Sequence, residues 1–106
     1  MEKVLITGGC GFIGSHLARE LVTEGYYVKI LDNLYRSTTK PIADLIENKN
    51  VDFIEGDVRY LSNLLDACEG IEYIYHQAAV CINKSVKNPS ESVDINLKGS
   101  VNVFEA

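Results

Sequence analysis

Apolar residues change their spacing several times along this chain, and each change predicts a different element of secondary structure. The run KVLIT at 3–7 carries consecutive apolar residues, which is typical of a short strand buried on both faces. From 12 to 24 apolar residues recur at four-residue spacing with charged residues between them, which predicts an amphipathic helix. Gly25 follows at the place where glycine commonly ends a helix. The apolar positions of this helix are Ile13, Leu17 and Leu21, with Ala18 and Val22 beside them.

The same alternation continues to the end of the chain. It predicts further strands at 26–32, 51–54 and 71–76, and further helices at 40–49, 61–68 and from 89 onward. Strands and helices that alternate with short connections require parallel strands joined by right-handed crossovers. The sequence therefore predicts an α/β fold of three layers, with one sheet between two layers of helices.

The last predicted helix has the clearest start. Asn88 is placed as the N-cap, Pro89 as the first helical residue, and Glu91 completes a capping box. Together these signals predict an amphipathic helix. Its apolar stripe consists of Val93, Leu97, Val101 and Phe104.

Composition indicates a single domain over residues 1–106. The chain is 46% hydrophobic and 24% charged, which is typical of globular proteins. A chain of this length buries enough surface for a modest core without a disulfide or a metal. Ten basic and fifteen acidic residues give a net charge of −5, and the basic residues are scattered, so no nucleic-acid partner is expected.

The cysteines and the hydropathy pattern indicate an intracellular protein. Cys10, Cys68 and Cys81 are odd in number and form no CxxC pair, which argues against a disulfide framework and against a zinc site. No apolar run approaches the ~18 residues of a membrane span, and glycines interrupt the N-terminus too early for a signal peptide. We therefore expect a cytoplasmic location and no membrane partner.

Four glycines stand in the stretch TGGCGFIG at 7–14, between the first predicted strand and the first predicted helix. Glycine costs about 1 kcal/mol relative to alanine inside a helix, so the cluster needs a reason. The pattern Gly9-x-Gly11-x-x-Gly14 in this position predicts a turn whose bare backbone holds a pyrophosphate at the positive end of the helix dipole. The alternative is a glycine-rich turn that holds no ligand.

Asp32 ends the second predicted strand, 18 residues beyond Gly14. A carboxylate at this place accepts hydrogen bonds from the hydroxyls of the adenosine ribose and repels a 2′-phosphate, which favours NAD over NADP. Arg36 leaves an alternative open, because a nearby guanidinium accommodates a 2′-phosphate, whereas a loop arginine is as often simply solvated. The predicted cofactor is NAD.

Five stretches of the chain, taken in order, carry a family resemblance. They are ITGGCGFIGSHL near the start, LDN at 31–33, EGDVR at 55–59, HQAA at 76–79 and the closing run NPSESVDINLKGSVNVFEA. They resemble the extended short-chain dehydrogenase/reductases, in particular the NAD-dependent nucleotide-sugar epimerases and dehydratases that UDP-glucose 4-epimerase typifies. Gly8, Gly11 and Gly14 carry the GxxGxxG spacing of that family. The resemblance implies a Rossmann-type doubly wound parallel sheet, here partial, with about four strands in the order 3-2-1-4.

The same resemblance implies cofactor contacts at the ends of the strands. Backbone amides would hold the pyrophosphate and two polar side chains the ribose, while the segments after the third and fourth strands would meet the adenine edge and the nicotinamide side. In that order the residues are Phe12 and Ile13, Asp32 and Asn33, Asp57 and Val58, then Gln77, Ala78 and Ala79, with Asn96 as an inward polar residue that steadies nearby loops. Asp57 has the alternative of capping the helix at 61–68, and Asn96 that of an exposed helix residue. His76 is expected to be a packed strand end.

The catalytic signature of that family is not found in the chain. Its chemistry depends on a Tyr-x-x-x-Lys pair, and no lysine here has a tyrosine four residues before it. No catalytic residue is therefore assigned, and no metal is expected. The chain is expected to be the NAD-binding portion of a nucleotide-sugar epimerase or dehydratase, with its substrate domain outside these residues and no turnover by itself. The alternative is a free-standing, non-catalytic NAD-binding module with a regulatory role.

The predicted strand order also has a consequence for association. It leaves the fourth strand as an open apolar edge, and such an edge pairs readily with another chain. We therefore expect the chain to associate with itself.

Overall fold

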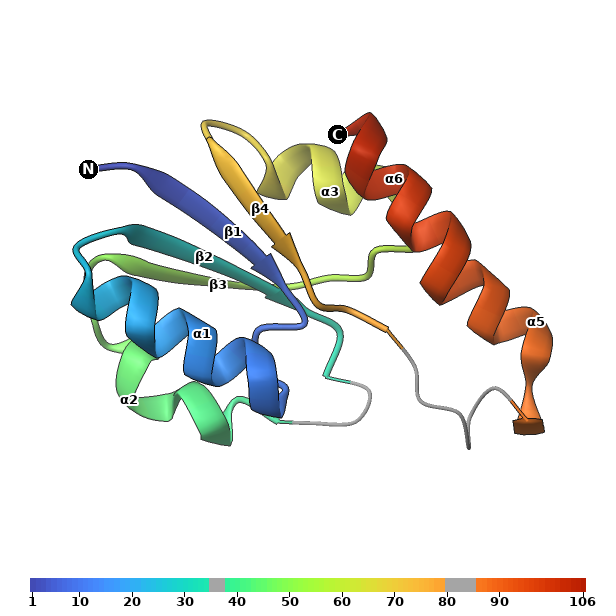
Figure 1. Ribbon diagram of the computed structural model, residues 1–106, viewed down its shortest axis with the longest axis horizontal. Coiled ribbons are helices and arrows are strands. Elements are labelled where there is room, and N and C mark those ends of the chain that lie inside the picture. Colours follow the sequence, from blue (N-terminus) through green and yellow to red (C-terminus); the bar gives the residue numbers. More distant parts are fainter. Residues whose placement is uncertain (35–37, 80–85) are drawn as a thin grey trace.

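The computed structural model describes residues 1–34, 38–79 and 86–106. Four parallel strands form one sheet in the order β3-β2-β1-β4, which confirms the predicted fold class and strand order (Figure 1). The strands are β1 (Lys3–Thr7), β2 (Tyr27–Asp32), β3 (Val51–Glu55) and β4 (Tyr73–His76). The helices are α1 (Phe12–Thr23), the 3₁₀ turn η1 (Lys40–Ile42), α2 (Ala43–Ile46), α3 (Leu61–Ala67), α5 (Pro89–Ser92), the π-helical segment η2 (Val93–Lys98) and α6 (Gly99–Glu105).

Helices cover both faces of the sheet (Figure 1). β1 shows why, because it is apolar at consecutive positions and alternate side chains of a strand point to opposite faces. Val4 and Ile6 lie in a core shared with α1 and α2, whereas Leu5 lies in a second core shared with α3 and α6. Each fully buried Leu or Ile stabilises the fold by about 1.5 to 3 kcal/mol relative to an exposed one, so both layers contribute substantially.

Helix α1 begins and ends as the sequence predicts, but one residue of its predicted apolar stripe is not buried. Gly25 has a φ of 95°, and its amide donates to the Val22 carbonyl while the Tyr26 amide donates to the Leu21 carbonyl, both at 3.1 Å. This pair of bonds is the Schellman motif, which confirms the predicted stop. Ile13, by contrast, is 68% exposed, so its place in the buried stripe is wrong. The inner face at the start of α1 belongs to the next residue, Gly14, and Ile13 is therefore turned outward.

The last helix also starts as predicted. The Asn88 side chain accepts a hydrogen bond from the Glu91 amide at 3.1 Å and donates to the Glu91 carboxylate at 3.0 Å, which completes the capping box.

The apolar stripe predicted on this helix is wrong, because all four of its residues are exposed and Phe104 is 90% exposed. A spacing of three and four residues marks one face of a helix, but it does not tell which face lies against the rest of the fold. Here the predicted stripe lies on the exposed face. The inner face follows the same kind of spacing and is formed by Ser92, Ile95, Gly99, Asn102 and Val103.

The other predicted elements lie within two residues of their observed ends, apart from the helix expected at 40–49. That segment divides into η1 and α2 and ends at Ile46, with Pro41 in its first turn as predicted. Arg19 of α1 donates to the Pro41 carbonyl at 3.0 Å and forms an exposed ion pair with Asp44 at 2.7 Å. These contacts hold the short α2 against α1, although an exposed pair of this kind contributes at most about 1 kcal/mol.

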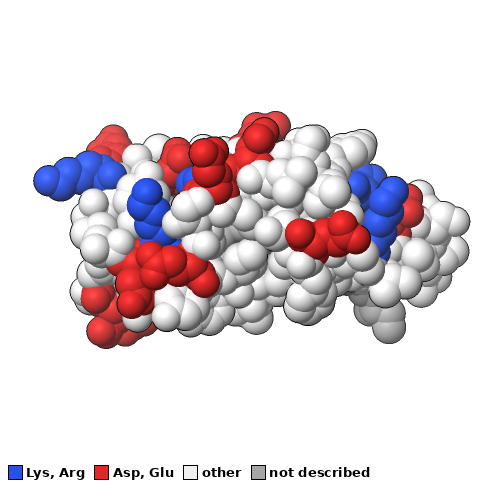
Figure 2. All heavy atoms as spheres, turned by 90° about the horizontal axis from the view of Figure 1, so that it is seen from above, with Lys and Arg blue, Asp and Glu red and all other residues white. Residues whose placement is uncertain are grey.

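Charged side chains of both signs are interspersed on the face seen in Figure 2, and uncharged surface covers much of its middle. Within the described ranges, every helix is either too short or too polar to cross a membrane. At the sheet edge, β4 exposes 53% of Tyr73 and 42% of Tyr75.

Candidate functional site

The carboxyl ends of all four strands meet at one edge of the sheet, because the strands are parallel (Figure 1). Each strand is followed there by a segment that the sequence singled out. Contacts join these segments in pairs: the turn after β1 with Asp32 of β2, Asn33 after β2 with Asp57 after β3, and Gly8 with the backbone of Ala78 after β4. The structure therefore brings the predicted site residues of the four strands to a single place.

The turn after β1 depends on glycine at three positions for the fold itself. Gly8 has a φ of 72°, and a Cβ there would lie 2.9 Å from the Ala78 amide nitrogen. A Cβ at Gly9 would collide with the Ile30 side chain. A Cβ at Gly14 would collide with the Gly8 carbonyl oxygen and lie 2.9 Å from the Gly9 Cα. Gly14 thus lets α1 approach the backbone of the turn closely.

Gly11 is different, because the interior of the protein does not require it. Among the described residues, a Cβ at this position would meet only the Gly8 carbonyl oxygen, at 3.4 Å, and the φ of −75° and ψ of 177° suit any residue. The space that its side chain would occupy lies outside the fold, at the mouth of α1. A bare backbone facing open space beside a helix start is the arrangement through which a phosphate group approaches closely.

The N-terminus of α1 adds positive potential at the same place. Gly11 is the N-cap and supplies no side-chain hydrogen bond, and helix geometry leaves the amides of Phe12 and Ile13 without acceptors inside the helix. The side chains of both residues are mostly exposed, at 74% and 68%. Their amides and the helix dipole together favour an anion at this end.

Asp32 lies at the end of β2 beside the glycine turn. Its Oδ2 accepts a hydrogen bond from the Cys10 amide at 3.0 Å, and its Oδ1 accepts one from the Leu34 amide at 2.8 Å. Leu34 has a φ of 60°, which a leucine seldom adopts, and the carboxylate holds that backbone in place. A carboxylate accepts about four hydrogen bonds, so acceptor capacity remains for hydroxyl groups of a ligand.

Asp57 is 8% exposed and occupies the loop after β3. Its carboxylate accepts from the Arg59 amide at 2.9 Å, from the Arg59 guanidinium at 2.7 to 3.1 Å, and from the Asn33 side chain at 3.1 Å. Burial alone would raise the pKa of Asp57, but the hydrogen bonds from Arg59 and Asn33 outweigh it and hold that pKa below its ordinary value.

These contacts overturn the alternative that Asp57 caps helix α3. The N-cap of α3 is Tyr60, and no side chain caps that helix. Asp57 instead joins Asn33 to Arg59 across the loop, and both of its carboxylate oxygens already accept hydrogen bonds from these partners. A base edge at this loop would therefore meet the backbone or displace Arg59.

The inward polar residue of the last helix is Asn102 rather than Asn96. Asn96 is exposed, so its predicted inward placement is wrong, while its part in cofactor binding stays a prediction. Asn102 is 8% exposed, and its Nδ2 donates to the carbonyls of Val58 at 2.9 Å and Arg59 at 3.1 Å. The sequence pattern did not indicate Asn102, because the more apolar face of a helix is expected to be the inner one and Asn102 lies on the other face.

Thr7 ties the ends of β1 and β4 together. Its hydroxyl oxygen accepts hydrogen bonds from the amides of Gln77 at 3.0 Å and Ala78 at 3.2 Å, so its own hydrogen is directed at His76 Nδ1, 2.6 Å away. His76 Nδ1 is therefore an acceptor, and the proton of the neutral ring lies on Nε2. The segment Gln77–Ala79, expected beside the nicotinamide, starts from this anchored strand end.

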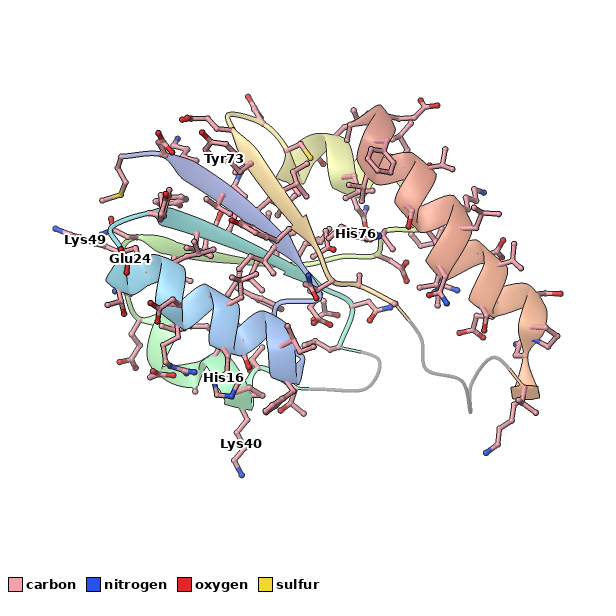
Figure 3. The ribbon with its side chains drawn as sticks, viewed as in Figure 1. His16, Glu24, Lys40, Lys49, Tyr73 and His76 are labelled. Carbon is pink, nitrogen blue, oxygen red and sulfur yellow. The ribbon has the colours of Figure 1, made fainter. Side chains whose placement is uncertain are left out.

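The other side of the His76 ring reaches the last helix (Figure 3). Its Nε2 donates to the Ser100 hydroxyl at 3.1 Å, and that hydroxyl donates to the Asn96 carbonyl at 2.6 Å. Burial lowers the pKa of His76 below its ordinary value of 6.5, in keeping with the neutral ring. His76 is a packed, hydrogen-bonded strand end, as the sequence predicts.

His76 predicts a loss of stability in mild acid. The pKa of His76 in the folded chain lies below 6.5, so on acidification the unfolded chain binds a proton before the folded chain does. The stability that the neutral ring contributes is therefore fully present above pH 6.5 and decreases as the pH falls toward the folded pKa. The urea midpoint of the native chain should be lower at about pH 5.5 than at about pH 7.5. The decrease should be smaller for His76→Asn, because an amide does not titrate in this range. An equal fall in both proteins would contradict this assignment.

Cys10 lies inside the glycine turn but carries no chemistry of its own. Burial, with Asp32 nearby, raises the pKa of its thiol to about 12, so the reactive thiolate is not populated at neutral pH. Within the described ranges, His, Cys, Asp and Glu side chains form no group of three that could hold a metal ion. The edge of the sheet is thus equipped to bind through backbone amides and carboxylate oxygens.

Comparison with known proteins decides the family. Residues 4–106 match the model of the family described as the NAD dependent epimerase/dehydratase family. The chain belongs to this family. The predicted resemblance is therefore confirmed.

Relatives within the NAD dependent epimerase/dehydratase family are epimerases of UDP-glucose by name. The chain is 37% identical to the UDP-glucose 4-epimerase of Klebsiella pneumoniae over 98% of its length and 78% of that protein. It is 36% identical to the UDP-glucose 4-epimerase of Neisseria meningitidis serogroup B over 99% of its length, but there it spans only 32% of the relative. Other relatives are matched over the same 32% of their length.

Solved structures of the family share this fold. The UDP-glucose 4-epimerase of Thermus thermophilus in complex with NAD superposes with a TM-score of 0.85 at 34% identity, over 97% of this chain and 32% of that one. An epimerase from Methanothermobacter thermautotrophicus gives a TM-score of 0.91 at 36% identity, over 98% and 31%. The Rossmann-type sheet predicted from the sequence is thus confirmed.

Proposed function

We propose that residues 1–106 form the NAD-binding portion of a nucleotide-sugar epimerase or dehydratase. The observation that carries the proposal is the pairing of two features at one sheet edge. Gly11 leaves open backbone at the mouth of α1, and the Asp32 carboxylate is bound to the amide of the neighbouring Cys10. An anion site and a hydroxyl-binding carboxylate, side by side at the ends of β1 and β2, match the diphosphate and the ribose of NAD.

Each part of NAD has a place in this arrangement. The amides of Phe12 and Ile13 would hold the pyrophosphate above Gly8, Gly11 and Gly14. Asp32 and Asn33 would hold the adenosine ribose, and the loop of Asp57 and Val58 would meet the adenine. The segment Gln77, Ala78 and Ala79, anchored through Thr7, would lie on the nicotinamide side. The backbone carbonyl of the exposed Asn96, which accepts a hydrogen bond from the Ser100 hydroxyl, would help to steady the loops near the cofactor.

The choice of NAD over NADP rests on Asp32. A 2′-phosphate would face this carboxylate, and two like charges in contact are unfavourable. Arg36, the residue that left the choice open in the sequence, falls outside the described residues. Support for NAD comes from the Thermus thermophilus relative, which was crystallised with it.

Bound NAD would supply a hydride acceptor at the carboxyl edge of the sheet. The chain's own residues would bind and orient it, and none of them provides the Tyr-x-x-x-Lys base of the family. We therefore propose no proton transfer within residues 1–106. The nucleotide-sugar substrate and the isomerase outcome rest on the names of the relatives, which act as UDP-glucose 4-epimerases.

Calorimetric titration with NAD tests this function. One NAD is expected to bind per chain, and NADP to bind at least about tenfold more weakly, the cost of roughly 1.4 kcal/mol of charge repulsion. Gly11→Val should remain folded, since its side chain points to open space, and should lose NAD because that space is the phosphate site. A folded native chain that takes up no NAD would end the proposal.

The free-standing regulatory module is the weaker alternative, because the relatives are epimerases by name. We propose further that the chain works in the cytoplasm, where free thiols such as Cys10 and Cys68 stay reduced.

Self-association is a separate proposal, supported by the exposed tyrosines of the β4 edge and by the exposed apolar residues of the last helix. Sedimentation velocity of the unliganded chain should show a dimer or larger species whose share grows with concentration. A monomer at every concentration would remove this part of the proposal.

A further inference from the structure

Asn102 is a buried polar residue that is not among the proposed contacts of the cofactor. It lies on α6, far along the chain from the loop that follows β3, yet both hydrogen bonds of its side chain go to that loop. Its Nδ2 donates to the Val58 carbonyl at 2.9 Å and to the Arg59 carbonyl at 3.1 Å. Removing a buried donor leaves its acceptors without partners at a cost larger than the bond itself, so these two bonds fix the loop strongly.

Gly99 supports the same contact from one turn earlier on α6. A Cβ at Gly99 would lie 2.6 Å from the Val58 Cγ2, so only a glycine lets the helix come this close. Positions 99 and 102 share one face of the helix, three residues apart. Packing by Gly99 and hydrogen bonding by Asn102 therefore act on one target, the backbone around Val58.

The held loop is the next one along the sheet from the proposed ribose site. The strand order places the phosphate turn after β1, Asp32 at the end of β2, and this loop after β3. A dinucleotide that follows this order carries its base outward from the ribose, over the loop of Asp57 and Val58. The Asp57 carboxylate is filled by Arg59 and Asn33, so the loop presents mainly its backbone, whose position Asn102 determines.

We propose that Asn102 is a positioning residue for recognition of the adenine base, acting through the carbonyls of Val58 and Arg59 without touching the cofactor. The proposal rests on NAD binding at the sheet edge and adds to it a determinant on the last helix. Adenine is recognised through the edge that carries N1 and the N6 amino group. A loop displaced by a few tenths of an ångström loses that recognition while the phosphate and ribose contacts remain.

The test is calorimetry with NAD and with nicotinamide hypoxanthine dinucleotide, in which an oxygen replaces the N6 amino group. The variant Asn102→Asp keeps the shape of the side chain but turns an acceptor toward two carbonyls. It is expected to raise the dissociation constant for NAD by about tenfold or more and to bring the two dinucleotides close to equal affinity. Asn50→Asp, which adds the same charge before β3 at the opposite edge of the sheet, should change neither value.

The possible outcomes distinguish this proposal from the proposed NAD-binding function on which it rests. Native chain that binds no NAD overturns both. Native chain that binds NAD but does not prefer it over the hypoxanthine analogue, or a variant that weakens both dinucleotides equally, overturns only the role of Asn102. If Asn102→Asp does not fold, Asn102→Ser keeps one donor and adds no charge, and it must still lower the preference for adenine for the proposal to hold.

Discussion

Gly14→Ala is expected to destabilise the fold by more than about 3 kcal/mol, a large share of the ~5 to 15 kcal/mol that holds a domain of this size together. The added methyl group would collide with the Gly8 carbonyl oxygen and press on the backbone of Gly9. Backbone atoms cannot turn aside as a flexible side chain can, so α1 must move away from the turn. The measurement is the free energy of unfolding in urea, without cofactor.

Gly11→Ala is the matched control for this experiment. It adds the same methyl group three residues earlier, where the only near atom of the described part of the chain is the Gly8 carbonyl oxygen at 3.4 Å and the backbone suits any residue. We expect a loss within about 1 kcal/mol, since alanine is a poorer N-cap than glycine. Equal unfolding midpoints for the two variants would show that the close approach of α1 to the turn is described wrongly.

Asp32→Ala is expected to weaken NAD binding by about 1.5 to 3 kcal/mol, the usual loss when a charged hydrogen bond is removed. The ribose hydroxyls would lose their acceptor, and the amides of Cys10 and Leu34 would lose theirs as well. The second effect loosens the turn that presents the phosphate site, so the loss should lie toward the upper end. Calorimetric titration of folded variant with NAD measures it.

Two further variants separate the causes. Asp32→Asn keeps the size of the side chain and one oxygen acceptor but removes the charge, so its preference for NAD over NADP should largely disappear. Asp52→Ala removes a carboxylate from an exposed position of β3 and should leave both affinities unchanged. An Asp32→Ala protein that is folded and binds NAD as the native chain does would exclude Asp32 from the site.

Some parts of the fold and of the candidate site can be predicted from the sequence, and others cannot. The position of the glycine turn and the placement of Asp32 follow from local patterns that the structure repeats with little change, whereas the strand order followed from the family resemblance. The end of α1 at Gly25 and the start of the last helix at Asn88 follow as well, because caps depend on residues only a few positions apart. Roles that depend on distant contacts were harder to foresee, as Asp57 shows: its carboxylate binds Asn33 of another loop, as well as its neighbour Arg59, and does not cap α3.

The last helix shows the limit most clearly. Apolar spacing identifies a face of a helix, but it does not identify what covers that face. The apolar residues that the pattern placed inside are exposed, and a polar residue, Asn102, is buried in their place. The covered face is set by contacts across the fold, where Gly99 packs against Val58 and Asn102 donates to the Val58 carbonyl.

The sequence by itself determined the alternation of strands and helices, the bare backbone between β1 and α1, and the carboxylate at the end of β2, because each depends on residues that are neighbours in the chain. Only the tertiary structure decided that Gly11 faces open space while Gly14 is enclosed, and that Asn102 rather than Asn96 points inward. The reason is that enclosure is a property of what lies across the fold. A pattern of spacings names the residues that can be buried, and the packing of helix against loop selects among them.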